Sequence, residues 1–210
     1  APMQQWNKIS CAPFDLRERF ISLIDREAEL STKHAPGHII AKMNSLVDPQ
    51  IIEHLYSAAK AGVKIDLIVR GTCCLKVEKD SGRIRVFSII DRFLEHSRIY
   101  YFNNGGAPEC YLASADWMPR NLDRRIEVLF PVENAKCRDI LVDCLHLQLK
   151  DKRKGRQMKP GSKYKRPNRR NDENTRSQKT TYDYFKAMVK SSSYNDDNGL
   201  LEPLTTPRSN

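Results

Sequence analysis

The chain has 210 residues, of which 40% are hydrophobic and 30% are charged, and its formal net charge at pH 7 is +10. A chain of this length can bury one substantial core, so we expect one folded domain with tails. The absence of any run of about 18 apolar residues excludes a predicted transmembrane helix, and the first residues lack the pattern of a secretory signal, so we expect a soluble, cytoplasmic protein.

The N-terminal third of the chain shows alternating helix and strand patterns. In chain order, the sequence predicts a helix, a buried strand, a second helix and a second strand, over residues 15–30, 38–44, 48–62 and 64–70. The second helix has the clearest limits, because Asp48 can cap its start, Pro49 suits its first position and Gly62 suits its end. A strand, a helix and a strand in this order predict two parallel strands joined by a right-handed crossover.

The middle of the chain is predicted to be rich in strands. Four further strands are expected over residues 84–89, 97–102, 110–114 and 125–132, followed by a helix over residues 135–149. Asn103–Gly106 is a hairpin signal between two of these strands, since Asn and Gly tolerate positive φ. These elements predict an α/β protein with a mixed sheet flanked by helices.

The positive charge is concentrated in one segment near the C-terminus. Residues 151–170 hold ten Lys or Arg against one Asp, whereas residues 1–150 are nearly neutral. We interpret residues 151–210 as a basic linker, a short amphipathic helix over residues 181–189 and a tail that is disordered from residue 191. The basic run can also attract a polyanion by releasing its counterions.

The six cysteines carry no metal-binding or disulfide pattern. They form no Cys-x-x-Cys pair and have no histidine at metal-ligand spacing. We therefore expect reduced thiols and no metal site within this chain.

Two strand ends present side chains that suit phosphate chemistry. Arg70 closes the strand over residues 64–70, and Gly71 lets the backbone come close to a ligand at the edge of the sheet. His96 precedes a later strand, where its imidazole can exchange a proton near neutral pH, and Arg98 follows two residues on. The alternative is that Arg70 forms a salt bridge and that His96 is structural or exposed.

Two further groups of polar residues extend this candidate site. The segment from Ser114 to Arg125 combines a hydroxyl, acids and amides with three arginines, and we interpret it as a phosphate cradle. Lys42 lies on an otherwise apolar strand, where it can reach a phosphate or extend its ammonium group to solvent.

Five runs of residues are recognisable together and in this order: Lys42–Asp48, Ile68–Gly71, Arg92–Arg98, Asn104–Gly106 and Ser114–Arg125. They resemble the last domain of the histidine-phosphorylated polyphosphate kinases, over roughly Cys11 to Lys150. The resemblance implies a phospholipase D-like fold. It also implies a part of an enzyme that reversibly transfers the terminal phosphate of ATP to a polyphosphate chain, through a phosphohistidine in a preceding domain. We expect this chain alone to be inactive.

The resemblance also implies roles for individual residues. His96 is the expected catalytic residue, and Arg70 and His96 are expected to bind the phosphates of ATP. The remaining members of the expected phosphate-binding set are Lys42, Arg98, Ser114, Asp116, Arg120, Arg124 and Arg125.

The implied partners are ATP, ADP, polyphosphate and the remainder of the same enzyme, which we expect to be a homo-oligomer and to bind no nucleic acid. Mg²⁺ is expected to accompany ATP, with its protein ligands in the preceding domain. Membrane association of the full enzyme stays an open alternative to a purely cytoplasmic location.

Two other functions stay open from the sequence. The run His96-Ser97-Arg98 resembles the His-x-Lys motif of phospholipase D, which allows a hydrolase or nuclease acting as a dimer. Arg98 in place of Lys, and Asn103 where the family has Asp, count against phosphodiester hydrolysis. The second alternative is a non-catalytic module that binds polyanions through residues 152–170.

Overall fold

The computed structural model describes residues 6–78, 82–166 and 175–190. Its strands are β1 (Ser10–Ala12), β2 (His38–Met43), β3 (Lys64–Val69), β4 (Ile84–Ile89), β5 (Ile99–Phe102), β6 (Glu109–Ala113), β7 (Glu127–Pro131), β8 (Gly155–Lys159) and β9 (Lys163–Lys165). Its helices are α1 (Leu16–Leu30), α2 (Pro49–Lys60), α3 (Pro119–Arg124), α4 (Ala135–Leu149) and α5 (Ser177–Lys190), with a short 3₁₀ turn, η1 (Asn104–Gly106).

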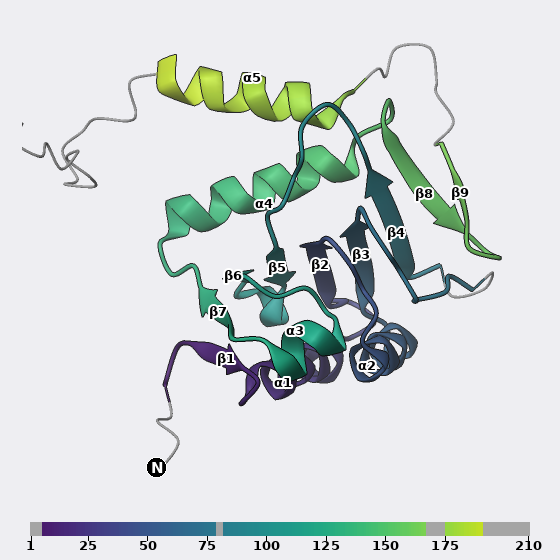
Figure 1. Ribbon diagram of the computed structural model, residues 1–210, viewed down its shortest axis with the longest axis vertical. Coiled ribbons are helices and arrows are strands. Elements are labelled where there is room, and N and C mark those ends of the chain that lie inside the picture. Colours follow the sequence, from purple (N-terminus) through teal and green to yellow (C-terminus); the bar gives the residue numbers. More distant parts are fainter. Residues whose placement is uncertain (1–5, 79–81, 167–174, 191–210) are drawn as a thin grey trace, which may run out of the picture.

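The strands form one mixed sheet in the order β1-β7-β6-β5-β2-β3-β4-β8-β9 (Figure 1). β2, β3 and β4 are parallel, which confirms the predicted parallel pair joined through α2. β5 runs antiparallel to β2, and β6 and β7 continue the antiparallel part of the sheet. These directions bring the C-terminal ends of β2, β3, β4 and β6 to the same edge as the N-terminal ends of β5 and β7.

Two hydrophobic cores lie on opposite faces of this sheet. The larger core lies under α1 and α2 and includes the packed aromatic rings of Phe20, Tyr100 and Trp117. The smaller core lies under α4, where Leu145 packs with Ile40. α5 packs against α4 in turn, and Figure 1 shows these two helices together on one side of the sheet. No helix within the described ranges is long and apolar enough to cross a bilayer.

Two local predictions around the hairpin have different outcomes. The predicted hairpin is confirmed, since η1 joins the antiparallel strands β5 and β6 and both of its glycines have positive φ. The predicted strand over residues 97–102 begins later, at Ile99, because Ser97 and Arg98 lie in the loop before it.

The structure differs most from the expected linker over residues 155–165. There β8 extends the sheet beyond β4, and β9 pairs with β8. The sequence did not predict these strands because the segment is rich in basic residues. Met158 nevertheless attaches the segment to the domain, since it is only 2% exposed and packs into the larger core. The short helix predicted over residues 181–189 is longer and spans Ser177–Lys190. The tail predicted from residue 191 onward lies outside the described residues.

A buried carboxylate anchors this C-terminal extension. Asp151, which is 3% exposed, accepts hydrogen bonds from the backbone amides of Lys154 and Gly155 at the start of β8. Its second oxygen accepts the amide of Ser177 at 2.7 Å, at the start of α5. The fold therefore ties the end of α4, the start of β8 and the start of α5 to one side chain.

A second buried carboxylate predicts a specific acid sensitivity. Asp66 in β3 is fully buried and accepts hydrogen bonds from His38 Nε2 at 2.9 Å and Arg85 Nε at 2.5 Å. Burial raises the pKa of Asp66, but these two donors outweigh burial and lower the pKa to about 2. The unfolded value is about 3.9, so this depressed pKa contributes about 2 kcal/mol of stability above pH ~4. We expect that contribution to be lost as the pH falls from about 4 to about 2.

Urea unfolding of wild type and Asp66→Asn at a series of pH values from 7 to 2 measures the effect. The difference between the two free energies of unfolding should be largest near pH 7 and should shrink toward pH 2. A difference that stays constant with pH would contradict the assignment of the charge to Asp66.

Candidate active site

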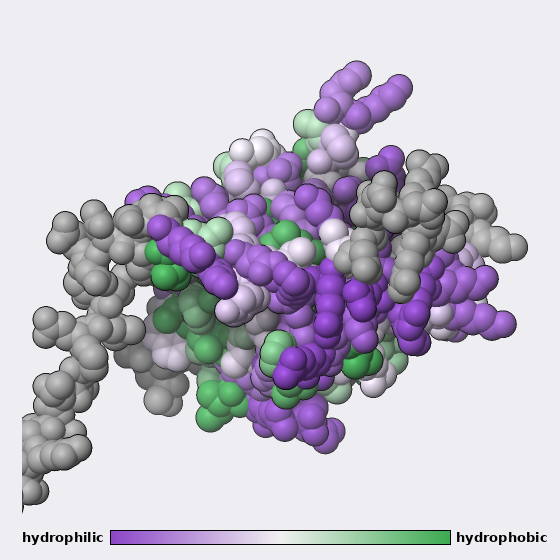
Figure 2. All heavy atoms as spheres, turned by 90° about the horizontal axis from the view of Figure 1, so that it is seen from above, coloured by the Kyte–Doolittle hydropathy of each residue, from purple (hydrophilic) through white to green (hydrophobic). Residues whose placement is uncertain are grey.

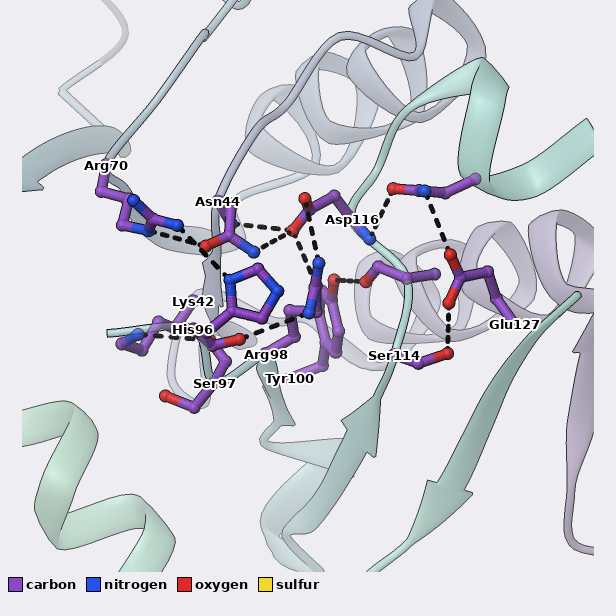
Figure 3. A network of polar contacts seen from close by, with 12 residues as sticks. Lys42, Asn44, Arg70, His96, Ser97, Arg98, Tyr100, Ser114, Asp116 and Glu127 are labelled. Atoms are coloured by element: carbon purple, nitrogen blue, oxygen red, sulfur yellow. Dashed lines mark hydrogen bonds and ion pairs between the residues drawn. The ribbon is translucent and has the colours of Figure 1, made fainter. Parts of the chain in front are cut away.

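Arg70 and His96 meet at the edge of the sheet where β3 ends. Arg70 Nη2 lies 3.4 Å from His96 Nδ1, and Figure 3 shows the imidazole beside the guanidinium group. Because arginine has no acceptor, Nδ1 is the acceptor in this contact, and the proton of the neutral ring is then on Nε2. The predicted proximity of the two side chains is confirmed, and it leaves an imidazole N–H free to donate to a ligand.

The backbone beside Arg70 explains how this geometry is fixed. Arg70 Nε donates to Asn44 Oδ1 at 2.6 Å, and the amide of Gly71 donates to the backbone oxygen of Asn44 at 2.7 Å. A Cβ atom at position 71 would lie 2.7 Å from that same oxygen. Only glycine allows the ends of β2 and β3 to approach in this way, and the approach holds the guanidinium group against Asn44.

Lys42 lies beneath the loop that carries His96. Its side chain is nearly buried, and Nζ donates to the backbone oxygen of Ser97 at 3.2 Å and lies 3.7 Å from Glu95 Oε2. Burial lowers the pKa of Lys42, the nearby Glu95 opposes this shift, and the charge of Arg70 adds to it. The ammonium group therefore supports the loop, and its predicted contact with phosphate stays a prediction.

Asp116 is the centre of the polar network. It is 5% exposed and accepts hydrogen bonds from the backbone and side-chain nitrogens of Asn44, at 2.8 and 3.1 Å. Arg98 Nε donates to it at 3.0 Å and Arg98 Nη2 at 3.4 Å. The charges of Arg98 and Asp116 therefore neutralise each other, and the pair joins the loop before β5 to the segment after β6, while Asn44 adds the end of β2.

The network continues from Asp116 away from His96. The backbone amide of Asp116 donates to Asn121 Oδ1 at 3.1 Å, and Asn121 Nδ2 donates to Glu127 Oε1 at 3.1 Å. Ser114 Oγ donates to the other oxygen of Glu127. Figure 3 shows Ser114 and Glu127 on the opposite side of Asp116 from Arg70. Sequence reasoning missed Glu127, although an acid inside a predicted strand was a visible signal.

The three arginines predicted to complete a phosphate cradle lie at α3 with exposed side chains. Arg125 is 4.0 Å from Glu127, and within the described ranges none of the three forms a hydrogen bond with Arg70 or His96. A residue that the sequence did not single out holds the helix in place, since Arg17 forms ion pairs with Asp48 and Asp123. Arg120, Arg124 and Arg125 are thus accessible, and their role stays a prediction.

The residues of the site do not fit a magnesium centre. Across the part of the chain that the structure describes, no group of three or more His, Cys, Asp or Glu side chains is placed to hold a metal ion. Asp116 already accepts from Asn44 and Arg98, and Glu95 faces Lys42, so neither carboxylate is free for a hard cation.

The fold is similar to that of a phospholipase D family member. The structure of Nuc, a phospholipase D family member from Salmonella typhimurium, superposes with a TM-score of 0.52 over 71% of this chain and 95% of that chain. At 15% identity this similarity shows the fold alone. The predicted α/β class, with a phospholipase D-like mixed sheet flanked by helices, is confirmed.

The family follows from the sequence, which matches the profile described as Polyphosphate kinase C-terminal domain 2 over residues 9–178. The chain belongs to this family, as the resemblance predicted. It is 50% identical over 163 residues to the polyphosphate kinase of Halalkalibacterium halodurans, which covers 77% of this chain and 23% of that protein. The crystal structure of polyphosphate kinase from Porphyromonas gingivalis has a TM-score of 0.85 and 37% identity, over 90% of this chain and 29% of that chain. This chain thus spans about a quarter of these relatives.

Proposed function

We propose that the chain serves polyphosphate kinase activity by binding the phosphates of ATP and polyphosphate at Arg70 and His96. The single observation that carries this proposal is the contact between the two side chains at the edge of the sheet. A planar guanidinium group suits two oxygens of one phosphate, and a neighbouring imidazole N–H suits a third. Exposed cations at α3 add positive charge for a longer anion.

In the proposed reaction, the bond between the terminal phosphorus and the bridging oxygen of ADP breaks as a phosphorus–nitrogen bond forms on a histidine. We place that histidine in the part of the relatives that lies outside this chain. The phosphorus–nitrogen bond then breaks as the end of a polyphosphate chain attacks. Phosphoryl transfer needs mainly positioning and positive charge, which Arg70 supplies, while the N–H of His96 can donate to the departing oxygen. We assign no ligand in this chain to the Mg²⁺ that accompanies ATP.

The purified chain is expected to bind tripolyphosphate weakly and to make no polyphosphate from ATP, because the proposed nucleophile lies outside it. Calorimetry at low ionic strength measures the binding, and His96→Ala should weaken it. Incubation with radiolabelled ATP tests for product, with the full-length Halalkalibacterium halodurans enzyme as the positive control. Labelled polymer made by the chain alone would contradict the assignment.

A second candidate function is non-catalytic binding of polyanions on the β8–β9 hairpin. Lys159 lies directly opposite Lys163, and like charges in this arrangement destabilise a strand pair. Neither lysine forms an ion pair within the described ranges, so a bound anion would relieve the repulsion. In Figure 2, hydrophilic side chains gather on the side where β8 and β9 lie in Figure 1. Binding that Lys163→Gln weakens and His96→Ala leaves unchanged would favour this candidate.

A further inference from the structure

The loop that carries His96 is held by a residue more than 80 positions downstream. Gln178, in the first turn of α5, pairs with both backbone groups of Phe93: the Phe93 amide donates to Gln178 Oε1 at 2.9 Å, and Gln178 Nε2 donates to the Phe93 oxygen at 2.8 Å. The same Nε2 donates to Glu95 Oε1 at 3.0 Å. A single amide side chain thus fixes the loop at two points within three residues of His96.

A second contact fixes the start of the same loop. Arg176 binds Asp91 with two parallel hydrogen bonds, from Nε and Nη2, each at 2.6 Å. Asp151 holds the amide of Ser177 between these two contact residues, so the segment that carries Arg176 and Gln178 is itself anchored to the fold. The His96 loop is therefore held by a segment that is itself hydrogen-bonded to the rest of the domain.

The loop has little apolar burial of its own. Phe93 is 64% exposed and Leu94 is 75% exposed, so the larger side chains before His96 contribute little to holding the loop in place. Polar contacts must then hold it. Glu95, which Gln178 contacts, lies 3.7 Å from the nearly buried ammonium group of Lys42, and Lys42 donates to the backbone of Ser97 on the far side of His96.

We propose that Gln178 is a positioning residue, which holds the His96 loop so that the imidazole meets Arg70 and both face one phosphate chain. This inference rests on the proposed function of Arg70 and His96. It makes the start of α5 part of the phosphate-binding unit, although within the described residues no side chain of α5 forms a hydrogen bond with His96. The competing explanation is that Gln178 only attaches α5 to the surface of the domain.

The test compares tripolyphosphate binding by the full chain and its variants. Gln178→Met keeps the length of the side chain and removes all three hydrogen bonds, and we expect it to weaken tripolyphosphate binding by about 5- to 10-fold. The control is Lys179→Met at the next position, where an exposed ion pair with Asp183 is lost and a change below about 2-fold is expected. Gln178→Glu provides a second variant, because its carboxylate would repel Glu95, and the same loss is expected.

A double-mutant cycle separates positioning from simple attachment. If Gln178 acts through His96, Gln178→Met should have less than about 2-fold further effect in a His96→Ala background. The same loss in both backgrounds, or no loss in the wild-type background, would overturn the proposal.

Ring signals of His96 in NMR spectra, assigned by their absence in His96→Ala, provide a readout that needs no ligand. They should shift in Gln178→Met and stay in place in Lys179→Met, and unchanged signals in Gln178→Met would overturn the proposal. Failure of the wild-type chain to bind tripolyphosphate would contradict the proposed function, and the ring signals would still decide whether Gln178 positions His96.

Discussion

Replacing Asp116 with alanine is expected to lower the free energy of unfolding by about 3–5 kcal/mol. The change removes one partner of a nearly buried ion pair, since the side chain of Arg98 is 13% exposed and that of Asp116 is 8% exposed. Arg98 would then be a desolvated charge without its counterion, and Asn44 would lose the acceptor for two of its hydrogen bonds. Urea unfolding followed by circular dichroism measures the loss.

Two comparisons make this prediction specific. Asp183→Ala removes an exposed partner of Lys179 and should change the stability by no more than about 0.5 kcal/mol. Adding Arg98→Met to Asp116→Ala should recover part of the loss, because it removes the unpaired charge. A loss below about 1 kcal/mol for Asp116→Ala would show that water compensates Arg98 and that the pair does not hold the site together.

Replacing Arg70 with alanine is expected to weaken the binding of tripolyphosphate to the chain by about 10- to 100-fold. The guanidinium group is the half-buried cation that meets His96, so its loss removes charge-assisted hydrogen bonds to phosphate. Arg70→Lys should recover only part of the affinity, because an ammonium group offers no planar pair of donors. Calorimetry at constant ionic strength measures all three proteins.

The control for this prediction removes one arginine at the opposite edge of the sheet. Arg83 precedes β4, is exposed and donates to the backbone oxygen of Gly62. Arg83→Ala lowers the net charge by the same amount, so any general effect of charge on anion binding will appear in both variants. If Arg70→Ala and Arg83→Ala lose the same amount of affinity for tripolyphosphate, binding depends on the overall positive charge of the chain. That result would contradict a specific site at Arg70.

The fold was predictable where a pattern within one short segment decides the structure. The apolar periodicity of α1, the capping signals of α2 and the glycines of η1 each act locally. β8 and β9 were missed because half of their residues are Lys or Arg and Met158 is the one large apolar side chain that they bury. β1 was missed because Ser10–Ala12 is too short to show alternation, and its pairing with β7 supplies the hydrogen bonds that define it.

The location of the site was predictable from the sequence, but the hydrogen bonds and ion pairs among its residues were not. Strand order brings Arg70 and His96 to one edge, and the sequence predicted that convergence. The pairing of Arg98 with Asp116 was not predictable, because either charge was equally suited to a ligand when considered alone. Gln178 carried no signal, since a glutamine in a polar helix is ordinary and its partner Phe93 lies 85 residues away.

The two outer strands of the sheet have a consequence for how copies of this chain behave near one another. β1 and β9 are each three residues long and leave one side of their backbone unpaired with any described strand. Pro13 follows β1 directly, and lysines occupy both ends of β9. Short strands, proline and lysine all oppose the addition of a foreign strand, so an open sheet of this width can remain free of edge-to-edge aggregation in a crowded solution.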